Sequence, residues 1–218
     1  LEPDLGTTMI IGTTSFIMYF IAKEGPDHAK LTFMSLLVLF IPLVIIAALL
    51  EPYRIGRVST YLHLLTTGEI SDPRGDGYQM QQILIGIGSG GFLGKGFGQS
   101  RQRFGYLVEN TAFTDSIFAV ILEELGFLGG TILVVAWTIF LWRGFKIGLN
   151  APDKQGKLLA IGITVWLTLQ ALLNMGANVG LIPLTGIPAP FLSYGGSSTI
   201  VTLAGIGILL NISKHSKG

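Results

Sequence analysis

Three acidic side chains near the start of an apolar segment are the first candidates for chemistry in this chain. Asp115 lies where a long polar, glycine-rich stretch gives way to apolar sequence, and Glu123 and Glu124 follow about two helical turns later. Ionisable groups at or below a membrane surface are costly to keep there, so they indicate a functional site by default. A carboxylate in a wet cleft at this position can accept a proton as a general base.

Asp115 also has a structural alternative. Asp is a good N-cap residue because its side chain accepts backbone N–H bonds at the start of a helix, and the positive end of the helix would hold it ionised in either role. Glu123 would lie about 12 Å deeper along an ideal helix, and Glu124 would face the opposite side from Asp115. The three carboxylates therefore cannot all point into one cleft, and we treat both glutamates as structural.

A run of glycines from 86 to 98 contains Lys95 and suggests a phosphate-binding loop. A P-loop needs Gly-Lys followed by Ser or Thr after a buried strand, whereas Lys95 is followed by Gly96, so a nucleotide site is disfavoured. The run is then either a flexible loop at the membrane surface or a segment whose glycine backbone approaches a lipid headgroup.

Polar and cationic side chains along this run would bind a phosphate in the second case. Arginine and lysine form charge-assisted hydrogen bonds to phosphate oxygens, although arginines that face an anionic membrane surface are as often simply solvated. The substrate-binding residues predicted here are Lys95, Gln99, Arg101 and Arg103.

A stripe of amides marks one face of a later apolar segment. Gln170, Asn174 and Asn178 recur every four residues, so they line one helix face. Amides that face lipid are costly, so this face should point into a helical bundle. The stripe either joins helices or lines a substrate groove. The three histidines show no metal-ligand spacing, and no metal site is predicted.

Composition indicates a membrane protein. The chain is 50% hydrophobic and 12% charged, about half the charged share of soluble domains. With 14 Lys+Arg against 13 Asp+Glu, it offers no basic surface for nucleic acid. Cysteine is absent, which excludes disulfides and thiolate metal sites.

We predict an all-α fold, a polytopic membrane helical bundle in one membrane domain over residues 1–218. A bilayer core needs about 20 helical residues per span, and only helices or closed barrels satisfy the backbone in lipid. The runs are too long and continuous for barrel strands. The five predicted spans are Leu5–Ala22, Phe33–Leu50, Ser116–Leu141, Leu158–Val179 and Ser193–Ile212.

The orientation follows from lysine and arginine in the short loops. With the C-terminus in the cytoplasm, the segments around 23–30, 143–157 and 214–217 lie inside. The long segment 51–115 is then a large extracytoplasmic loop. Within it, Ile55–Leu65 is predicted to be an amphipathic helix on the interface, Tyr78–Ile87 a second amphipathic or a re-entrant helix, and residues 72–77 are predicted turns.

Several long motifs occur in order along nearly the whole chain: Pro3 to Thr7, Asp72-Pro73, Gly77-Tyr78-Gln79, Gly90 to Ser100, Thr114 to Val120, Glu123 to Gly126, and the closing signature Gly176 to Ser198. Together they resemble the motifs of the SEDS family, the FtsW, RodA and SpoVE proteins of bacterial cell-wall synthesis. One local departure is the stretch after Glu109, where Asn110 to Phe113 replace the family's Ala-His before Thr114.

The resemblance implies ten spans, of which this chain would be the last five, so the missing N-terminal half of the same protein is one expected partner. It implies a peptidoglycan glycosyltransferase that polymerises lipid II at the outer face of the bacterial cytoplasmic membrane. A class B penicillin-binding protein is the other expected protein partner.

The same resemblance assigns roles to single residues. Asp115 matches the family's essential Asp and would be the general base. Lys95, Arg101 or Arg103, with or without a divalent cation (Mg²⁺ or Mn²⁺), would stabilise the pyrophosphate leaving group. No organic cofactor is expected. The remaining predicted substrate-binding residues are Asn174, Asn178 and Ser193.

Two other functions suit the same features. A carrier that moves the lipid-linked precursor across the membrane would also need hydrophobic spans, buried amides and a cationic loop. A non-catalytic scaffold for a penicillin-binding transpeptidase is the third interpretation. The sequence does not separate elongation, division and sporulation subtypes.

Overall fold

The computed structural model describes residues 5–22, 52–71, 77–101 and 112–216. The predicted span Phe33–Leu50 and the predicted turns at 72–76 lie outside these residues. The described elements are helices and turns with no strand among them, which confirms the all-α class. The helices are α1 (Leu5–Ala22), α3 (Pro52–Thr67), α4 (Tyr78–Gly90), α6 (Ile117–Leu149), α7 (Lys154–Asn178) and α8 (Gly196–His215).

Three of these helices, α6, α7 and α8, are long and apolar enough to cross a membrane, and α1 is a shorter apolar helix. They correspond to four of the five predicted spans. α3 and α4 correspond to the two helices predicted within the long loop, and each begins or ends within three residues of its predicted bounds. The chain is therefore an integral membrane protein, with the two further helices α3 and α4 between α1 and α6.

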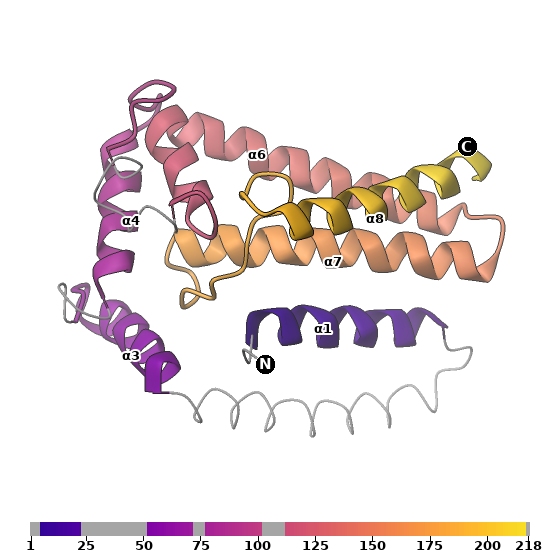
Figure 1. The fold of residues 1–218 in the computed structure, drawn as a ribbon, viewed down its shortest axis with the longest axis horizontal. Coiled ribbons are helices and arrows are strands. Elements are labelled where there is room, and N and C mark those ends of the chain that lie inside the picture. The colour runs from indigo at the N-terminus through magenta and orange to yellow at the C-terminus, as the bar shows by residue number, and fades with distance from the viewer. Residues whose placement is uncertain (1–4, 23–51, 72–76, 102–111, 217–218) are drawn as a thin grey trace.

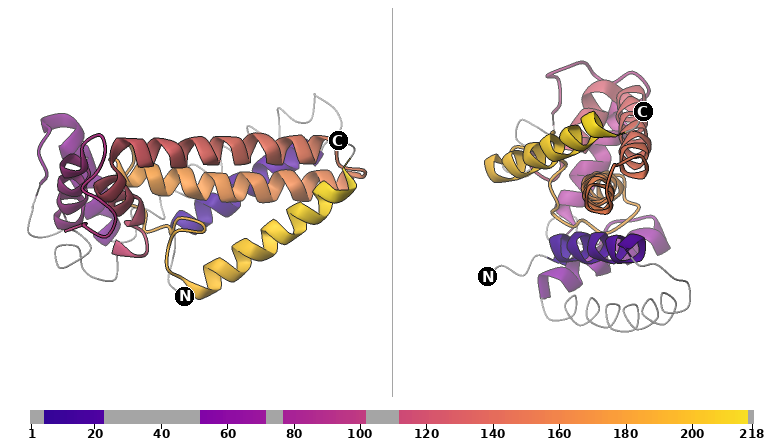
Figure 2. Two further views of the ribbon diagram at one scale, coloured as in Figure 1. Left: turned by 90° about the horizontal axis from the view of Figure 1, so that it is seen from above. Right: turned by 90° about the vertical axis from the view of Figure 1, so that its right-hand side faces the viewer.

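The apolar helices run lengthwise, and α4 crosses one end of them (Figure 1). α1 lies along α7 on the side away from α6, and α3 lies beside α4. Figure 2 shows that α8 diverges from the α6–α7 pair toward its own N-terminal end. The end crossed by α4 is where α6 begins and α7 finishes, so the elements before and after these helices meet there.

Small residues allow α6 and α7 to pack closely. A Cβ on Gly144 would lie 2.1 Å from Thr164 Oγ1, and one on Gly148 would lie 2.5 Å from the Ile161 side chain. In lipid, helix association depends on such close packing because the tails are as apolar as the side chains. An apolar core then fills the interface, made of Phe118, Leu122, Trp137, Leu167, Ala171 and Met175.

Helix α7 begins and ends at residues that suit its termini. The Asp153 side chain accepts a hydrogen bond from Gly156 N at 3.2 Å, which satisfies one free N–H of the first turn. At the other end Gly180 has φ 75°, and Leu181 N donates to Gly176 O at 2.8 Å. This is a Schellman cap, which glycine favours because it adopts the left-handed conformation without strain.

Helix α6 is broken rather than continuous. At Gly126 the backbone has φ 65° and ψ −167°, and the short first part turns away from the long second part (Figure 1). Loop 91–96 satisfies the backbone groups that the break exposes, as the ends of helices require. Its four hydrogen bonds are Lys95 N to Glu123 O (3.0 Å), Gly96 N to Glu124 O (2.9 Å), Phe127 N to Gly91 O (2.9 Å) and Leu128 N to Phe92 O (3.1 Å).

Glycines in this loop allow two backbones to touch. A Cβ on Gly94 would lie 2.1 Å from Glu124 O, and a Cβ on Gly126 would lie 2.3 Å from Gly94 N. The glycine run predicted a loop that is flexible or that approaches a lipid headgroup. In the structure Gly94 instead approaches the protein's own broken helix, and the run begins inside α4, which extends to Gly90.

In addition to the main-chain hydrogen bonds, the Glu123 side chain binds residues in and after the loop. Its carboxylate is fully buried and accepts hydrogen bonds from Lys95 Nζ at 2.7 Å, Ser100 Oγ at 2.6 Å and Arg101 N at 3.2 Å. A buried ion pair offsets its desolvation cost only when further hydrogen bonds satisfy the charges, and this one has them. Glu123 therefore has a structural role, as expected.

Candidate active site

Asp115 lies in the turn just before α6, at the end of the bundle that α4 crosses. The N-cap of α6 is Ser116, and no side chain caps this terminus. The Asp115 carboxylate is therefore not used as the helix cap, contrary to the structural alternative. It accepts hydrogen bonds from Thr114 Oγ1 at 3.0 Å and from Gln79 Nε2 at 3.4 Å, and the residue is half-buried.

The backbone around Asp115 is fixed by residues that follow it by 59 to 78 positions. Asn174 and Asn178 donate from their Nδ2 atoms to Asp115 O at 2.7 and 2.8 Å. Ser193 Oγ donates to Thr114 O. These bonds hold the main chain from both sides while leaving the carboxylate to other contacts, so the acid is placed with little freedom.

The turn that presents Ser193 is itself constrained. Phe191 has φ 66°, a left-handed conformation that is uncommon for a bulky residue. Its ring stacks on Trp137 with centroids 5.9 Å apart, and Ser193 Oγ accepts from Ala189 N at 2.7 Å. The closing signature thus forms a rigid turn between α7 and α8 that supports the Asp115 backbone.

The amide stripe on α7 joins segments of the protein. Gln170 Nε2 donates to Pro188 O at 2.9 Å, and Asn174 Nδ2 also donates to Ile187 O at 2.7 Å. Asn174 and Asn178 are each 1% exposed. Of the two predicted roles, the structure displays the joining one, and substrate contact by Asn174, Asn178 or Ser193 stays a prediction.

The predicted phosphate-binding residues form a second group, around Glu123. Lys95 directs its ammonium to Glu123, and 28% of the Lys95 side chain is exposed. Gln99 and Arg101 are exposed, while Arg103 lies outside the described residues. Asp115 and Glu123 stand at opposite ends of the first part of α6, so the structure does not merge the two groups into one cluster.

Two residues on α3 and α4 that were not predicted as site residues are linked to Asp115, one directly and one through the other. Gln79, in the first turn of α4, donates from Nε2 to Asp115 Oδ2 and also to Ser116 Oγ at 3.3 Å. Arg57 on α3 donates from one guanidinium nitrogen to Gln79 Oε1 at 3.3 Å. Gln79 lies in one of the matching segments, but nothing in the sequence marked either residue as a neighbour of Asp115. That follows only from the packing of α4 on α6 and from the contact of Arg57 with Leu184.

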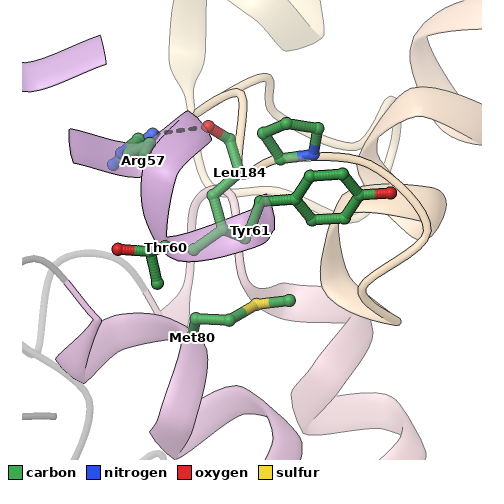
Figure 3. Close-up of a pocket in the computed structure, with 6 residues that line it drawn as sticks. Arg57, Thr60, Tyr61, Met80 and Leu184 are labelled. Carbon is green, nitrogen blue, oxygen red and sulfur yellow. Dashed lines mark hydrogen bonds between the residues drawn. The ribbon is translucent and has the colours of Figure 1, made fainter. Parts of the chain in front are cut away.

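Arg57 also connects α3 to the closing signature. Its other terminal nitrogen donates to Leu184 O at 2.9 Å, the bond drawn in Figure 3. The accompanying cavity has a volume of about 10 Å³ and is lined by Arg57, Thr60, Tyr61, Met80, Pro183 and Leu184. A space of this size accommodates about one water molecule, so it is a packing site rather than a substrate site.

Among the residues that the structure describes, no three His, Cys, Asp or Glu side chains gather in a way that could hold a metal ion. The divalent cation suggested by the resemblance stays a prediction.

Comparisons with known proteins agree along the whole chain. Residues 1–218 match the FtsW/RodA/SpoVE family, described as "Cell cycle protein". The chain is 45% identical over 218 residues to stage V sporulation protein E of Bacillus subtilis (strain 168), covering 99% of this chain and 56% of that protein. It is 40% identical over 215 residues to a probable peptidoglycan glycosyltransferase FtsW of Halothiobacillus neapolitanus, covering 97% and 49%.

Solved structures share the fold. One, described as "Structural coordination of polymerization and crosslinking by a peptidoglycan synthase complex", matches with a TM-score of 0.71 and 30% identity over 98% of this chain and 56% of that one. A mutant of the rod-shape-determining protein RodA from Thermus thermophilus matches with a TM-score of 0.57 and 24% identity, covering 100% and 52%. The chain spans about half the length of the relatives it matches.

Proposed function

The chain belongs to the FtsW/RodA/SpoVE family, and we propose that it carries the catalytic carboxylate of a peptidoglycan glycosyltransferase that polymerises lipid II. Relatives named as probable peptidoglycan glycosyltransferases support this at the level of the family. Since those relatives are about twice as long, the proposed activity belongs to this chain together with a preceding half of similar size.

In the proposed reaction, a sugar hydroxyl of the acceptor attacks the anomeric carbon of the donor. The new glycosidic bond forms as the bond to undecaprenyl pyrophosphate breaks, and the anomeric centre inverts. The hydroxyl proton passes to the Asp115 carboxylate as the oxygen attacks, and the pyrophosphate leaves with the bonding electrons. A general base placed in this way contributes about 10²–10⁴-fold to the rate.

The observation that carries this proposal is that the main chain around Asp115 is held by several hydrogen bonds while its carboxylate is not used to stabilise the fold. Four hydrogen-bond donors hold the main-chain carbonyls of Phe113, Thr114 and Asp115. The carboxylate itself neither caps the helix nor forms an ion pair with a described residue. A base needs a fixed position and an available lone pair, and this arrangement supplies both.

The leaving group requires positive charge near its phosphates. We assign this to Arg101, which is exposed beside the glycine loop, and to Arg103, with or without Mg²⁺ or Mn²⁺. Lys95 contributes less because its ammonium is already paired with Glu123. Binding of fluorescent lipid II should weaken in Arg101→Glu and Arg103→Glu, and unchanged binding would remove these two residues from the proposal.

The proposed site faces the outside of the bacterial cytoplasmic membrane. The opposite end of the bundle carries Arg143 and Lys146 near the end of α6 and Lys154 and Lys157 in the first turn of α7, and cationic short loops remain in the cytoplasm. The similarity to a peptidoglycan synthase complex that combines polymerization and crosslinking supports a class B penicillin-binding protein as the partner.

The test uses the protein with its preceding half restored, purified in detergent together with its transpeptidase partner, Mg²⁺ and lipid II. Asp115→Ala and Asp115→Asn should each lower glycan formation by at least about 10²-fold. Asp153→Asn is the matched control, because Asn is an equally good N-cap for α7, and it should polymerise normally.

Two results would contradict the proposal. If both Asp115 variants polymerise at the rate of the unchanged protein, Asp115 is not the base. If the unchanged protein is inert under these conditions, the carrier or the scaffold function is favoured, since transport across a membrane is impossible in detergent micelles.

A further inference from the structure

We propose that Gln79 is a positioning residue for the Asp115 carboxylate, and that Arg57 fixes the direction in which the Gln79 amide points. This inference rests on the proposed function of Asp115 as a base. It adds a role for two residues of the external segment, one on α3 and one on α4.

The orientation of the Gln79 amide follows from its neighbours. A guanidinium group has only donors, so the end of the amide that faces Arg57 at 3.3 Å must be the oxygen, Oε1. The NH₂ end is then turned to Asp115 Oδ2 at 3.4 Å and Ser116 Oγ at 3.3 Å. The assignment comes from hydrogen-bond chemistry, which is the basis for deciding amide orientation.

This orientation matters for a general base. An NH₂ donor on Oδ2, together with Thr114 Oγ1 on Oδ1 at 3.0 Å, restricts rotation of the carboxylate about its Cβ–Cγ bond. Each oxygen keeps further lone pairs for the incoming hydroxyl. If the amide were reversed, its oxygen would face the carboxylate oxygen, and the repulsion would turn the carboxylate away.

Arg57 is itself held in place. Its other terminal nitrogen donates to Leu184 O at 2.9 Å, as Figure 3 shows. The series therefore runs from the closing signature through Arg57 and Gln79 to Asp115, and it supplements the direct support of the Asp115 backbone by Asn174 and Asn178. Asp115 is therefore supported twice: Asn174 and Asn178 hold its main chain, and Gln79, through Arg57, contacts its side chain.

The test compares variants in the lipid II polymerisation assay with the full-length protein and its partner. Gln79→Met keeps the size of the side chain but removes the donor, and Gln79→Glu keeps an oxygen for Arg57 but places a second oxygen against Asp115. Gln81→Met, the same change two residues further along α4, is the matched control. Each variant is measured for kcat, KM and thermal unfolding temperature.

We expect Gln79→Met to lower kcat about tenfold and to leave KM within about twofold, since a misdirected base slows chemistry rather than binding. Gln79→Glu should lower kcat further, while its contact with Arg57 preserves the fold. Gln81→Met should match the unchanged protein. A purely structural role for Gln79 would lower the unfolding temperature without this separation of kcat from KM.

Arg57→Met tests the second half of the proposal. If Arg57 acts through Gln79, the kcat loss in the double variant Arg57→Met/Gln79→Met will be smaller than the product of the two single losses. A loss equal to that product, or full kcat in both Gln79 variants, would overturn the inference. An inactive unchanged protein would instead contradict the proposed function, so the two failures are distinguishable.

Discussion

At the scale of the residue, Ser193 shows how a single hydroxyl fixes the candidate base. It donates to Thr114 O and accepts from Ala189 N at 2.7 Å, so it joins the residue before Asp115 to the turn that carries Phe191. The Ser193 side chain is small and contributes through its two hydrogen bonds. Loss of the hydroxyl should therefore change the position of Thr114 and Asp115 more than the packing of the core.

We expect Ser193→Ala to destabilise the protein by about 1–3 kcal/mol, because a carbonyl and an N–H both lose their partner. Polymerisation of lipid II should fall about tenfold as Thr114 and Asp115 gain freedom. Ser197→Ala, at an exposed position in the first turn of α8, is the control. Equal kcat in the two variants would show that Ser193 does not position the base.

Single residues also show which features of a site a sequence can mark. Asp115 stood out because a carboxylate beside an apolar helix is uncommon, and the structure gives its backbone unusual support. Gln79 lies in a matching segment, but neither it nor Arg57 was marked as a site residue, since amides and arginines are ordinary in a long polar loop. Their roles depend on the packing of α4 against α6 and on the contact of Arg57 with Leu184, which no spacing in the sequence encodes.

At the scale of the element, the break in α6 is the feature that sequence patterns missed. Apolar residues continue on both sides of Gly126, so the hydropathy of the segment is that of one long span. What distinguishes this position is a backbone of φ 65° in contact with another backbone. Glycine permits both, but many helices contain glycine without breaking.

We predict that Gly126→Ala will destabilise the protein by about 2–5 kcal/mol, from backbone strain and from overpacking against loop 91–96. The added Cβ would lie 2.5 Å from Phe92 O. Thermal unfolding in detergent measures the effect. Gly88→Ala is the control, because a Cβ there meets no atom within 4 Å, and the change should be neutral or slightly stabilising in helix α4. Similar unfolding temperatures for the two variants would contradict this account.

The helices themselves followed from elementary patterns. Unbroken apolar runs predicted α6, α7 and α8, and the spacing of apolar residues predicted α3 within one turn of its observed bounds. Helix α7 begins after Asp153 and ends just before Gly180, and both residues are ordinary signals of helix ends. How α8 diverges from the other helices depends on the turn before it and was not predictable from composition.

At the scale of the whole molecule, charge is distributed between two ends. The end that holds Asp115 carries α3 and α4. The other end carries Arg143 and Lys146 near the end of α6 and Lys154 and Lys157 in the first turn of α7. We therefore expect the two ends to lie on opposite sides of the membrane, with the cationic turn in the cytoplasm.

The natural absence of cysteine allows a direct topology measurement. Glu69→Cys and Gln155→Cys, both at exposed positions, are to be treated with a membrane-impermeant maleimide in intact cells stripped of the outer permeability barrier. Glu69→Cys should react at once, and Gln155→Cys only after the cytoplasmic membrane is permeabilised. The reverse pattern would place the candidate base on the wrong side for an extracytoplasmic polymerase.

The attachment of loop 91–96 to α6 has a consequence for how this region can change. The bonds that span the break use main-chain atoms, whereas Phe92, Leu93 and Phe97 are 65%, 74% and 84% exposed. Those three positions can therefore be exchanged to suit bilayers or neighbours of different character, while the scaffold that carries the carboxylate keeps its shape. Because the loop is held by its main chain, its exposed side chains can change, whereas the glycines that allow the close backbone contact cannot.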